Sequence, residues 1–399
     1  MNEAQLRELL RETPVPGAAE AERRGKAMVL AAYEQRPRER RAVLPRFAAA
    51  VAAAVLLAIL VLSPAGATVR GWIDDVFTAG VPGAEKALTR VPGGGRLVVQ
   101  SQAGPWVVQP DGSRRLLGDY REATWSPHGL YLAAAKGRTL TAVEPDGTPH
   151  WSLTAPATMR DPRWSPSGYR IAYRSGVELR VVHADGTADS LLDSRVAPVA
   201  PSWAPSGVHQ LAYVDGRGQI VLRDVDSDRV LGRAVGLPGI ETLEWGPGGV
   251  LLEASPAAVG VRLLVLDKLS GRLRISHLRR LRLPAAGRIA DVALAPDGRT
   301  VAVLSQVDRS ARAHAEISLI DIRTGAVRRL FGTPGRLGEI AWSSRGDRLL
   351  VAWPAADQWL FIPAQARSRV KAVAGISAAF APGAEARSFP SVEGWCCRR

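Results

Sequence analysis

The stretch Trp-Ser-Pro-Ser-Gly-Tyr-Arg-Ile-Ala-Tyr at residues 164–173 is the clearest copy of a phrase that recurs along this chain of 399 residues. In each copy a large apolar residue precedes a short turn, most often Ser-Pro-x-Gly or Ala-Pro-x-Gly, and a strand-like apolar run follows. Six good copies begin at Trp125, Trp164, Trp203, Trp245, Leu294 and Trp342, and a weaker seventh begins at Phe380. These first residues lie 39, 39, 42, 49, 48 and 38 residues apart. A repeat of this length built from short strands is typical of a β-propeller blade.

Each residue type in the phrase has a physical role. Pro fixes φ, and Gly accepts a positive φ at no steric cost, so the phrase predicts a tight turn. We expect the large residue before the turn to end an inner strand and to fill the wedge between neighbouring blades. The residues that the phrase marks as such anchors are Trp125, Pro127, Gly129, Trp164, Pro166, Gly168, Trp203, Pro205, Gly207, Trp245, Pro247, Leu294, Pro296, Gly298 and Trp342.

The remainder of each repeat also has strand character. Apolar runs follow the turns, and Asp-Gly, Ser-Gly or Thr-Gly pairs at residues 146–147, 185–186, 270–271 and 324–325 predict hairpins between the outer strands. The chain is therefore predicted to be all-β, with four strands in each blade.

The two ends of the repeat region predict how the ring closes. Residues 96–100, 106–109 and 114–117 supply three strands before the first anchor, and residues 378–381 supply one inner strand after the last. Strands from both termini in one blade would remove the exposed edges of an open sheet. We predict seven blades over residues 96–385, followed by a tail at 386–399, with six blades and an accessory hairpin as the alternative.

The Trp-Ser-Pro-x-Gly phrase followed by an Ile-Ala-Tyr strand resembles the propeller repeats of TolB-like proteins, distant relatives of WD repeats. The resemblance covers roughly residues 90–399. It implies a propeller that binds other macromolecules through its faces. The separate α/β domain that precedes the propeller in TolB itself has no counterpart in the sequence, so only the repeat architecture is carried over.

The segment before the propeller is of a different kind. Residues 1–46 contain ten Lys/Arg and seven Glu and have partly helical composition, whereas residues 47–69 contain no charged residue. These 23 residues are enough to cross a hydrocarbon core, which needs about 20. We expect an uncleaved transmembrane helix at 47–69; the alternative is a cleaved secretory signal that ends near Ala67.

Basic residues on the N-terminal side of this segment predict its orientation. Five arginines lie between residues 36 and 46, so the positive-inside rule places residues 1–46 in the cytosol and the propeller outside the plasma membrane. Residues 70–95, rich in Gly and Pro, are predicted to form a juxtamembrane linker.

The formal net charge of +14 does not by itself indicate a nucleic-acid-binding protein. Forty-seven of the 52 basic residues are Arg, and they are scattered along the repeats without a basic block or a set of interleaved aromatic residues. We therefore expect no nucleic-acid partner. The preference for Arg over Lys, with much Ala, Gly and Pro, indicates a bacterial genome of high GC content, as in actinobacteria.

Motifs that carry chemistry are absent from the sequence. There is no Gly-x-Ser-x-Gly elbow, no zinc-binding His-Glu-x-x-His and no phosphate-binding Gly-x-x-x-x-Gly-Lys, and the six histidines are isolated along the chain. The two cysteines, Cys396 and Cys397, are adjacent, so we expect either free thiols in a frayed tail or a vicinal disulfide. The sequence predicts no enzyme, no metal site and no cofactor.

Two functions from different classes fit these features. The first is a membrane-anchored extracytoplasmic propeller that binds a protein, glycan or lipid partner at the cell envelope without catalysis. The alternative is a transmembrane signalling regulator, similar to anti-sigma factors, in which the propeller is the sensor and residues 1–46 dock a cytosolic regulator.

Overall fold

The computed structural model describes residues 84–206, 208–267, 272–283, 287–309, 312–365, 369–381 and 388–397. The predicted cytosolic segment at 1–46, the predicted transmembrane helix at 47–69 and the first part of the predicted linker lie outside these residues. Within the described part of the chain, no helix has both the length and the apolar character needed to span a membrane.

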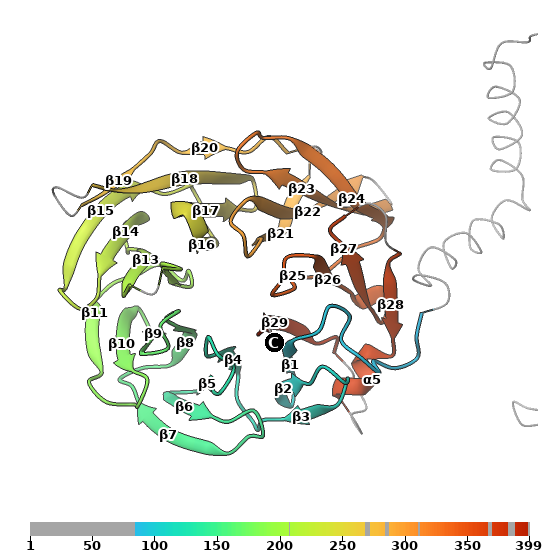
Figure 1. Ribbon diagram of the computed structural model, residues 1–399, viewed down its shortest axis with the longest axis horizontal. Coiled ribbons are helices and arrows are strands. Elements are labelled where there is room, and N and C mark those ends of the chain that lie inside the picture. The colour runs from blue at the N-terminus through green and yellow to red at the C-terminus, as the bar shows by residue number, and fades with distance from the viewer. Residues whose placement is uncertain are drawn as a thin grey trace, which may run out of the picture. The chain divides into compact units, whose positions relative to one another are not determined.

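Seven antiparallel sheets surround a common centre, which confirms the prediction of seven blades (Figure 1). Blade 1 consists of β4 (Glu122–Trp125), β5 (Leu132–Lys136), β6 (Thr139–Val143) and β7 (Pro149–Thr154). Blade 2 consists of β8 (Met159–Trp164), β9 (Arg170–Ser175), β10 (Glu178–His183) and β11 (Ser190–Asp193). Blade 3 consists of β12 (Ser202–Trp203), β13 (Gln210–Val214), β14 (Gln219–Asp224) and β15 (Arg229–Val235).

Blades 4 to 6 continue the ring. Blade 4 consists of β16 (Thr242–Gly246), β17 (Val250–Ser255), β18 (Ala258–Asp267) and β19 (Arg272–Ile275), and the short β20 (Arg279–Arg280) also pairs with β18. Blade 5 consists of β21 (Arg288–Leu294), β22 (Thr300–Arg309), β23 (Arg312–Asp321) and β24 (Val327–Pro334). Blade 6 consists of β25 (Ile340–Trp342), β26 (Arg348–Trp353), β27 (Gln358–Pro363) and β28 (Lys371–Ala374). Two short 3-10 helices, Pro247–Gly249 and Pro354–Ala356, occur within blades 4 and 6.

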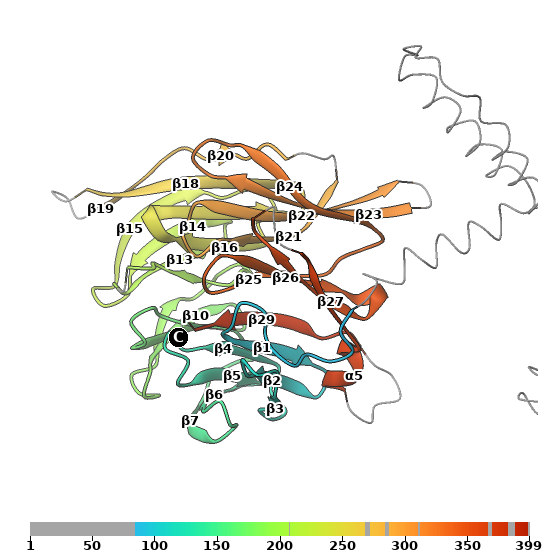
Figure 2. The ribbon, with the colours of Figure 1, turned by 45° about the vertical axis from the view of Figure 1, so that its right-hand side comes forward.

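Blade 7 joins the two ends of the propeller, as predicted, but with a different strand. It consists of β29 (Ser391–Cys396), β1 (Arg96–Ser101), β2 (Gly104–Val108) and β3 (Arg114–Leu116). β29 and β1 lie side by side in both views (Figures 1 and 2), and Leu97 is the register partner of Trp395. The closing strand therefore lies in the segment 386–399 that was predicted to be a tail.

The segment predicted to close the ring is a helix. Residues 376–380 form α5 (Ile376–Phe380), which buries Ile376 and Phe380 against blades 6 and 7. These two residues are four positions apart and share one helical face. The weak seventh phrase at Phe380 is thus not an anchor, and Trp395, which ends the inner strand of blade 7, occupies the anchor position instead.

The anchor turns of blades 1, 2, 5 and 6 have the predicted geometry. The amide of the Gly donates a hydrogen bond to the carbonyl three residues earlier, at 2.9 Å from Gly168 to Ser165 and at 2.8 Å from Gly298 to Ala295. Both glycines have positive φ, +80° and +69°. A Cβ at Gly298 would also lie 2.6 Å from the carbonyl oxygen of Pro247 in the preceding blade, so only Gly fits there.

The hydrophobic core is divided into seven clusters, one at each junction between neighbouring blades. Trp203 packs among Ala172, Leu179 and Val181 of blade 2 and Leu211 and Tyr213 of its own blade. The other anchors occupy the same place in their clusters: Trp125, Trp164, Trp245, Leu294, Trp342 and Trp395. The large residues therefore lie in the wedge between blades.

Two anchor indoles also form hydrogen bonds across the junction. Trp203 Nε1 donates to the carbonyl of Arg163 at 2.9 Å, and Trp342 Nε1 donates to the carbonyl of Ala293 at 3.0 Å. Each acceptor immediately precedes the anchor of the previous blade. At these two junctions, packing and a polar contact together hold a blade in register with the one before it.

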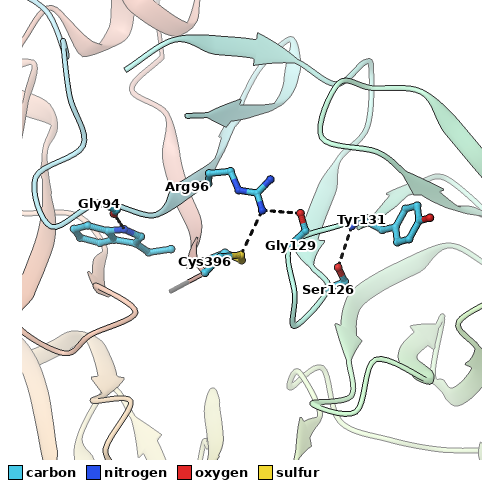
Figure 3. Close-up of a disulfide and its surroundings, with 8 residues drawn as sticks. Gly94, Arg96, Ser126, Gly129, Tyr131 and Cys396 are labelled. Atoms are coloured by element: carbon cyan, nitrogen blue, oxygen red, sulfur yellow. Dashed lines mark hydrogen bonds between the residues drawn. A yellow bond between two sulfur atoms is a disulfide. The ribbon is translucent and has the colours of Figure 1, made fainter. Parts of the chain in front are cut away.

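The C-terminal cysteines are paired and ordered. Cys396 and Cys397 form a vicinal disulfide at the end of β29. Figure 3 shows the Arg96 guanidinium between the anchor turn at Gly129 and this disulfide, with Nη2 at 2.7 Å from the Gly129 carbonyl oxygen and 3.7 Å from Cys397 Sγ. The same guanidinium stacks on Trp125, 4.7 Å from its ring centroid. Of the two states left open by the sequence, the vicinal disulfide is the one found, and the frayed tail with free thiols is not.

The described end of the predicted linker is docked on the propeller. Glu85 forms a parallel bridge with Val373 at the outer edge of blade 6, and its side chain pairs with Lys371 at 3.0 Å. The backbone of Glu85 therefore pairs with the edge of β28, where backbone groups would otherwise be exposed.

Candidate functional site

The inner strands of the seven blades face the centre of the ring (Figure 1). Each inner strand begins after a loop from the outer strand of the previous blade and ends at its anchor turn. The two ends of these strands therefore define two faces of the propeller. The loops that precede the inner strands make one face, and the anchor turns make the other.

Carboxylates on the inner strands link neighbouring blades. Glu122 accepts a hydrogen bond from the Asp161 amide at 2.6 Å, and Glu244 accepts one from the Leu294 amide at 3.0 Å. Equivalent bonds join Asp291 to the Ile340 amide, Glu339 to the Val392 amide and the Ser202 hydroxyl to the Trp245 amide. In five junctions, a side chain therefore satisfies a backbone donor of the next blade that has no strand partner.

Burial in the wall of the ring raises the pKa of three of these groups, among them Glu339, whose pKa rises to about 7. It raises the pKa of Glu244 to about 7, and the nearby charge of Asp291 adds to this rise. Burial likewise raises the pKa of Asp291 to about 6, although its bonds to backbone amides oppose the shift. The folded propeller therefore binds protons on these carboxyl groups more tightly than the unfolded chain does.

These shifts predict a stability that depends on pH. A raised pKa stabilises the fold fully below the ordinary carboxyl range, and this contribution is lost as the pH rises through 6 to 7. We expect the free energy of unfolding to fall between about pH 5 and about pH 8, by about 1 kcal/mol for each group once partial solvent screening is allowed for. Urea titrations at both pH values measure this. The double variant Glu244→Gln, Asp291→Asn should reduce this change in the free energy of unfolding with pH. Glu144→Gln, at an exposed turn, should leave it unchanged. If the double variant kept the same pH dependence, the raised pKa values of Glu244 and Asp291 would not be its cause.

A large recess lies on the face opposite the anchor turns. It has a volume of about 740 Å³ and is formed where blades 7, 1 and 2 meet. Its lining comes from the turn between β1 and β2, the loop before β4, the turn between β5 and β6, the start of β8 and the loop before β29. The lining residues are Gln100, Ser101, Gln102, Asp119, Tyr120, Arg121, Glu122, Lys136, Gly137, Arg160, Ser388, Phe389 and Ser391. We call this the mouth recess.

The mouth recess has an excess of positive charge. Its two carboxylates are already paired, Glu122 with Arg160 at 3.0 Å and Asp119 with Lys136 at 2.7 Å. Arg121 is exposed and has no side-chain partner among the described residues. One cation is therefore left to attract an anionic group.

Aromatic surface accompanies this charge. Tyr120 and Phe389 line the recess and are half-buried. Gln100 fixes the loop beneath them, because its amide nitrogen donates to the carbonyls of Ser101 and Tyr120 at 3.1 and 3.2 Å. Arg and aromatic residues together are typical of the energetically dominant part of protein interfaces.

The anchor residues do not form this site. Trp125 ends β4, whereas Arg121 precedes it, so anchor and recess lie at opposite ends of the same strand. Trp164 and Trp203 line a second recess of about 610 Å³ between blades 2, 3 and 4. Gly207 lies outside the described residues. Nothing in the repeated phrase indicated the recess residues, since they lie in the loops between repeats, where length and sequence vary.

The electrostatic character of the ring wall changes with position. Glu244, Asp291 and Glu339 lie on blades 4, 5 and 6, whereas the unpaired Arg121 lies at blade 1. Within the described residues, no group of three or more His, Cys, Asp or Glu side chains has an arrangement that could hold a metal ion. Recognition by charge and shape is the chemistry that the mouth recess offers.

Comparison with known structures agrees with the fold. The β-propeller domain of Cps50 (Swd1) from Myceliophteria thermophila superposes with a TM-score of 0.52 at 17% identity, covering 64% of this chain and 89% of that one. Hydrazine synthase of Kuenenia stuttgartiensis gives a TM-score of 0.47 at 16% identity, covering 60% and 75%. No protein-family model and no curated protein matches the sequence. The chain is thus similar in fold to WD-repeat-like seven-bladed propellers, and the TolB-like resemblance rests on the repeated phrase alone.

Proposed function

We propose that this protein is a membrane-anchored, extracytoplasmic binding module whose mouth recess holds an anionic group of a macromolecular partner at the cell envelope, without chemistry at that recess. The observation that carries the proposal is the exposed Arg121, which lines the recess with Tyr120, Lys136 and Arg160 and has no side-chain partner among the described residues, whereas both of these other cations are paired.

The fold supports this role physically. A closed ring holds its loops on rigid strands, so the loops lose little conformational entropy when a partner binds to them. The mouth recess collects loops from three blades, which gives a concave surface that no single blade could form. Its carboxylates are neutralised by their own partners, so an acidic segment of a protein or an anionic glycan would meet net positive charge.

Membrane attachment belongs to the same proposal. It rests on the uncharged residues 47–69 and on the arginines that precede them. With this orientation the propeller would face the anionic polymers and headgroups of the envelope.

Charge reversal at the mouth recess tests the binding proposal. We expect Arg121→Glu to weaken binding of the propeller to dextran sulfate and to a polyglutamate peptide by about tenfold, corresponding to about 1.4 kcal/mol. Isothermal titration at two salt concentrations measures this, with neutral dextran as the negative probe. Arg217→Glu is the matched control, because Arg217 is also exposed, in the turn between β13 and β14 of blade 3. An equal loss in both variants would mean that only the overall charge matters.

The signalling alternative requires residues 1–46 as a docking segment, whereas the binding proposal does not. Deleting residues 2–44 would remove a cytosolic docking segment but leave the proposed anchor and the propeller in place. We expect binding by the mouth recess to survive this deletion. If partner capture on intact cells disappeared with these residues, the transmembrane regulator would be the better description.

A further inference from the structure

A serine, a histidine and an aspartate meet on the anchor-turn face, at the junction between blades 2 and 3. Ser167 lies in the anchor turn of blade 2, and its Oγ is 2.8 Å from His209 Nε2. His209 precedes β13, and its Nδ1 is 2.5 Å from Asp226 Oδ2 in the turn between β14 and β15. The histidine is therefore not isolated, as the sequence suggested, but bonded through both ring nitrogens.

The hydrogen-bond network fixes which groups donate. Burial would raise the pKa of Asp226, but the hydrogen bond and charge of His209 and the charge of Arg170 outweigh this and hold that pKa below its usual range. The ionised carboxylate can only accept, so Nδ1 carries a proton, and in the tautomer with a single ring proton Nε2 is an acceptor. Ser167 must then donate its hydroxyl proton to Nε2.

Two further contacts hold this chain of bonds in place. Ser165 Oγ accepts from the Arg170 amide at 3.0 Å and lies 2.9 Å from Ser167 Oγ, to which it donates because the Ser167 proton is already engaged. Arg170 Nη2 is 3.0 Å from Asp226 Oδ1. Nucleophile, base and carboxylate are thus each positioned by a neighbour on the frame of two blades.

The three side chains are also reachable from solvent. The His209 side chain is 15% exposed and that of Asp226 is 52% exposed. Tyr169 and Val208, each adjacent in sequence to this cluster, are 67% and 45% exposed. Each lies within two residues of a member of the cluster and offers an exposed apolar group that an aromatic or short aliphatic acyl group could contact.

We infer that Ser167 is an activated nucleophile, with His209 as its general base and Asp226 as a positioning residue, and that it accepts acyl groups from small carboxylic esters. In the first step, Ser167 Oγ would bond to the ester carbonyl carbon while its proton passes to His209 Nε2. The alcohol would then leave with that proton, and the acyl group would remain on the serine. Water would attack the acyl group in turn and give one proton to His209; as the carboxylic acid leaves, His209 would return this proton to Ser167 Oγ, so the net reaction is ester hydrolysis.

This activity goes beyond binding at the mouth recess, from which it is separated by the length of the inner strands. No oxyanion-stabilising pair of amides is assigned to the site, so acylation is expected to be readily detected and turnover to be slow.

A fluorophosphonate probe on the full chain tests the inference. Ser167 Oγ would displace fluoride at phosphorus, and peptide mass spectrometry would locate the adduct. We expect Ser167 to be labelled roughly a hundredfold faster than Ser227, a rate ratio in the range of general-base catalysis. Ser227 is the internal control, since its hydroxyl is exposed and donates to Asp224 without a histidine partner.

Variants separate activation from mere exposure. His209→Gln should reduce labelling of Ser167 to the level of Ser227, and Ser167→Ala should abolish labelling at that position. Similar labelling of Ser167 and Ser227 in the unaltered protein would overturn the inference, and this comparison does not depend on whether a variant folds. Labelling of Ser167 that His209→Gln left unchanged would overturn it as well, and would leave the cluster as a polar link between blades.

Discussion

Removing the closing strand is expected to cost the propeller its cooperative fold. A chain that ends at residue 390 lacks β29, so β1 loses its partner along Arg96–Ser101 and the core between blades 6 and 7 loses Trp395. Loss of one buried Trp alone costs about 3 to 5 kcal/mol, a large part of the 5 to 15 kcal/mol by which domains are typically stable. We expect a broad, early thermal transition by circular dichroism and aggregation through the exposed edge of β1.

Two controls distinguish this effect from simple shortening. A chain that lacks only residues 398–399, which lie beyond β29, should melt as the full protein does. A peptide of residues 388–397 added to the truncated chain should restore part of the transition, since it supplies the missing strand. A sharp, unshifted transition after truncation at 390 would show that the ring is not closed by β29.

Breaking the buried ion pair of blade 4 is expected to have an effect of similar size. Glu253 is fully buried on β17, and Arg262 on β18 lies 2.6 Å from it. Arg262 also donates to the carbonyls of Val235 and Ser276, and Glu253 accepts from the Leu237 amide at 3.0 Å. Glu253→Gln leaves the guanidinium buried without its counter-charge, which we expect to lower the free energy of unfolding by about 3 to 5 kcal/mol.

Urea denaturation of matched variants measures this loss. Asp228→Asn breaks the exposed pair with Arg223 and should change stability by about 1 kcal/mol or less. The double variant Glu253→Met, Arg262→Met should recover much of the loss, because it removes both charges together. If Glu253→Gln were as mild as Asp228→Asn, the pair would not be buried in the way the structure shows.

The sequence predicted the blades well because the information that specifies a blade is local. Turn residues, strand periodicity and the spacing of the anchors all lie within about 40 residues, so each repeat could be interpreted by itself. The number of blades followed from the three strands at residues 96–117 and the need to remove a sheet edge.

The closing strand was misplaced because its pairing is not local. Phe380-Ala381-Pro382-Gly383 matches the repeated phrase, yet Ile376 and Phe380 share one face of a helix. Residues 391–396 lack a Ser-Pro-x-Gly turn and become a strand through pairing with β1, which lies about 300 residues earlier. Only Trp395, in the place of an anchor, offered a clue.

The candidate sites were beyond sequence reasoning for a related reason. The lining of the mouth recess comes from five separate segments, and Ser167, His209 and Asp226 come from two blades. Arg121 is one of many arginines, and what distinguishes it is that the neighbouring carboxylates Asp119 and Glu122 are paired with Lys136 and Arg160 instead, which only the folded structure shows. A search for contiguous catalytic motifs could not detect a histidine bonded to residues 42 positions before it and 17 after it.

Photo-crosslinking on intact cells tests most directly whether the mouth recess is the binding face. A photoreactive amino acid would replace Tyr120 in one variant and Val327, which is 37% exposed on the outer strand of blade 5, in another. We predict that position 120 yields a discrete crosslinked species, that Arg121→Glu abolishes it, and that position 327 yields none. Crosslinks of equal strength from both positions, or from position 327 alone, would contradict the account.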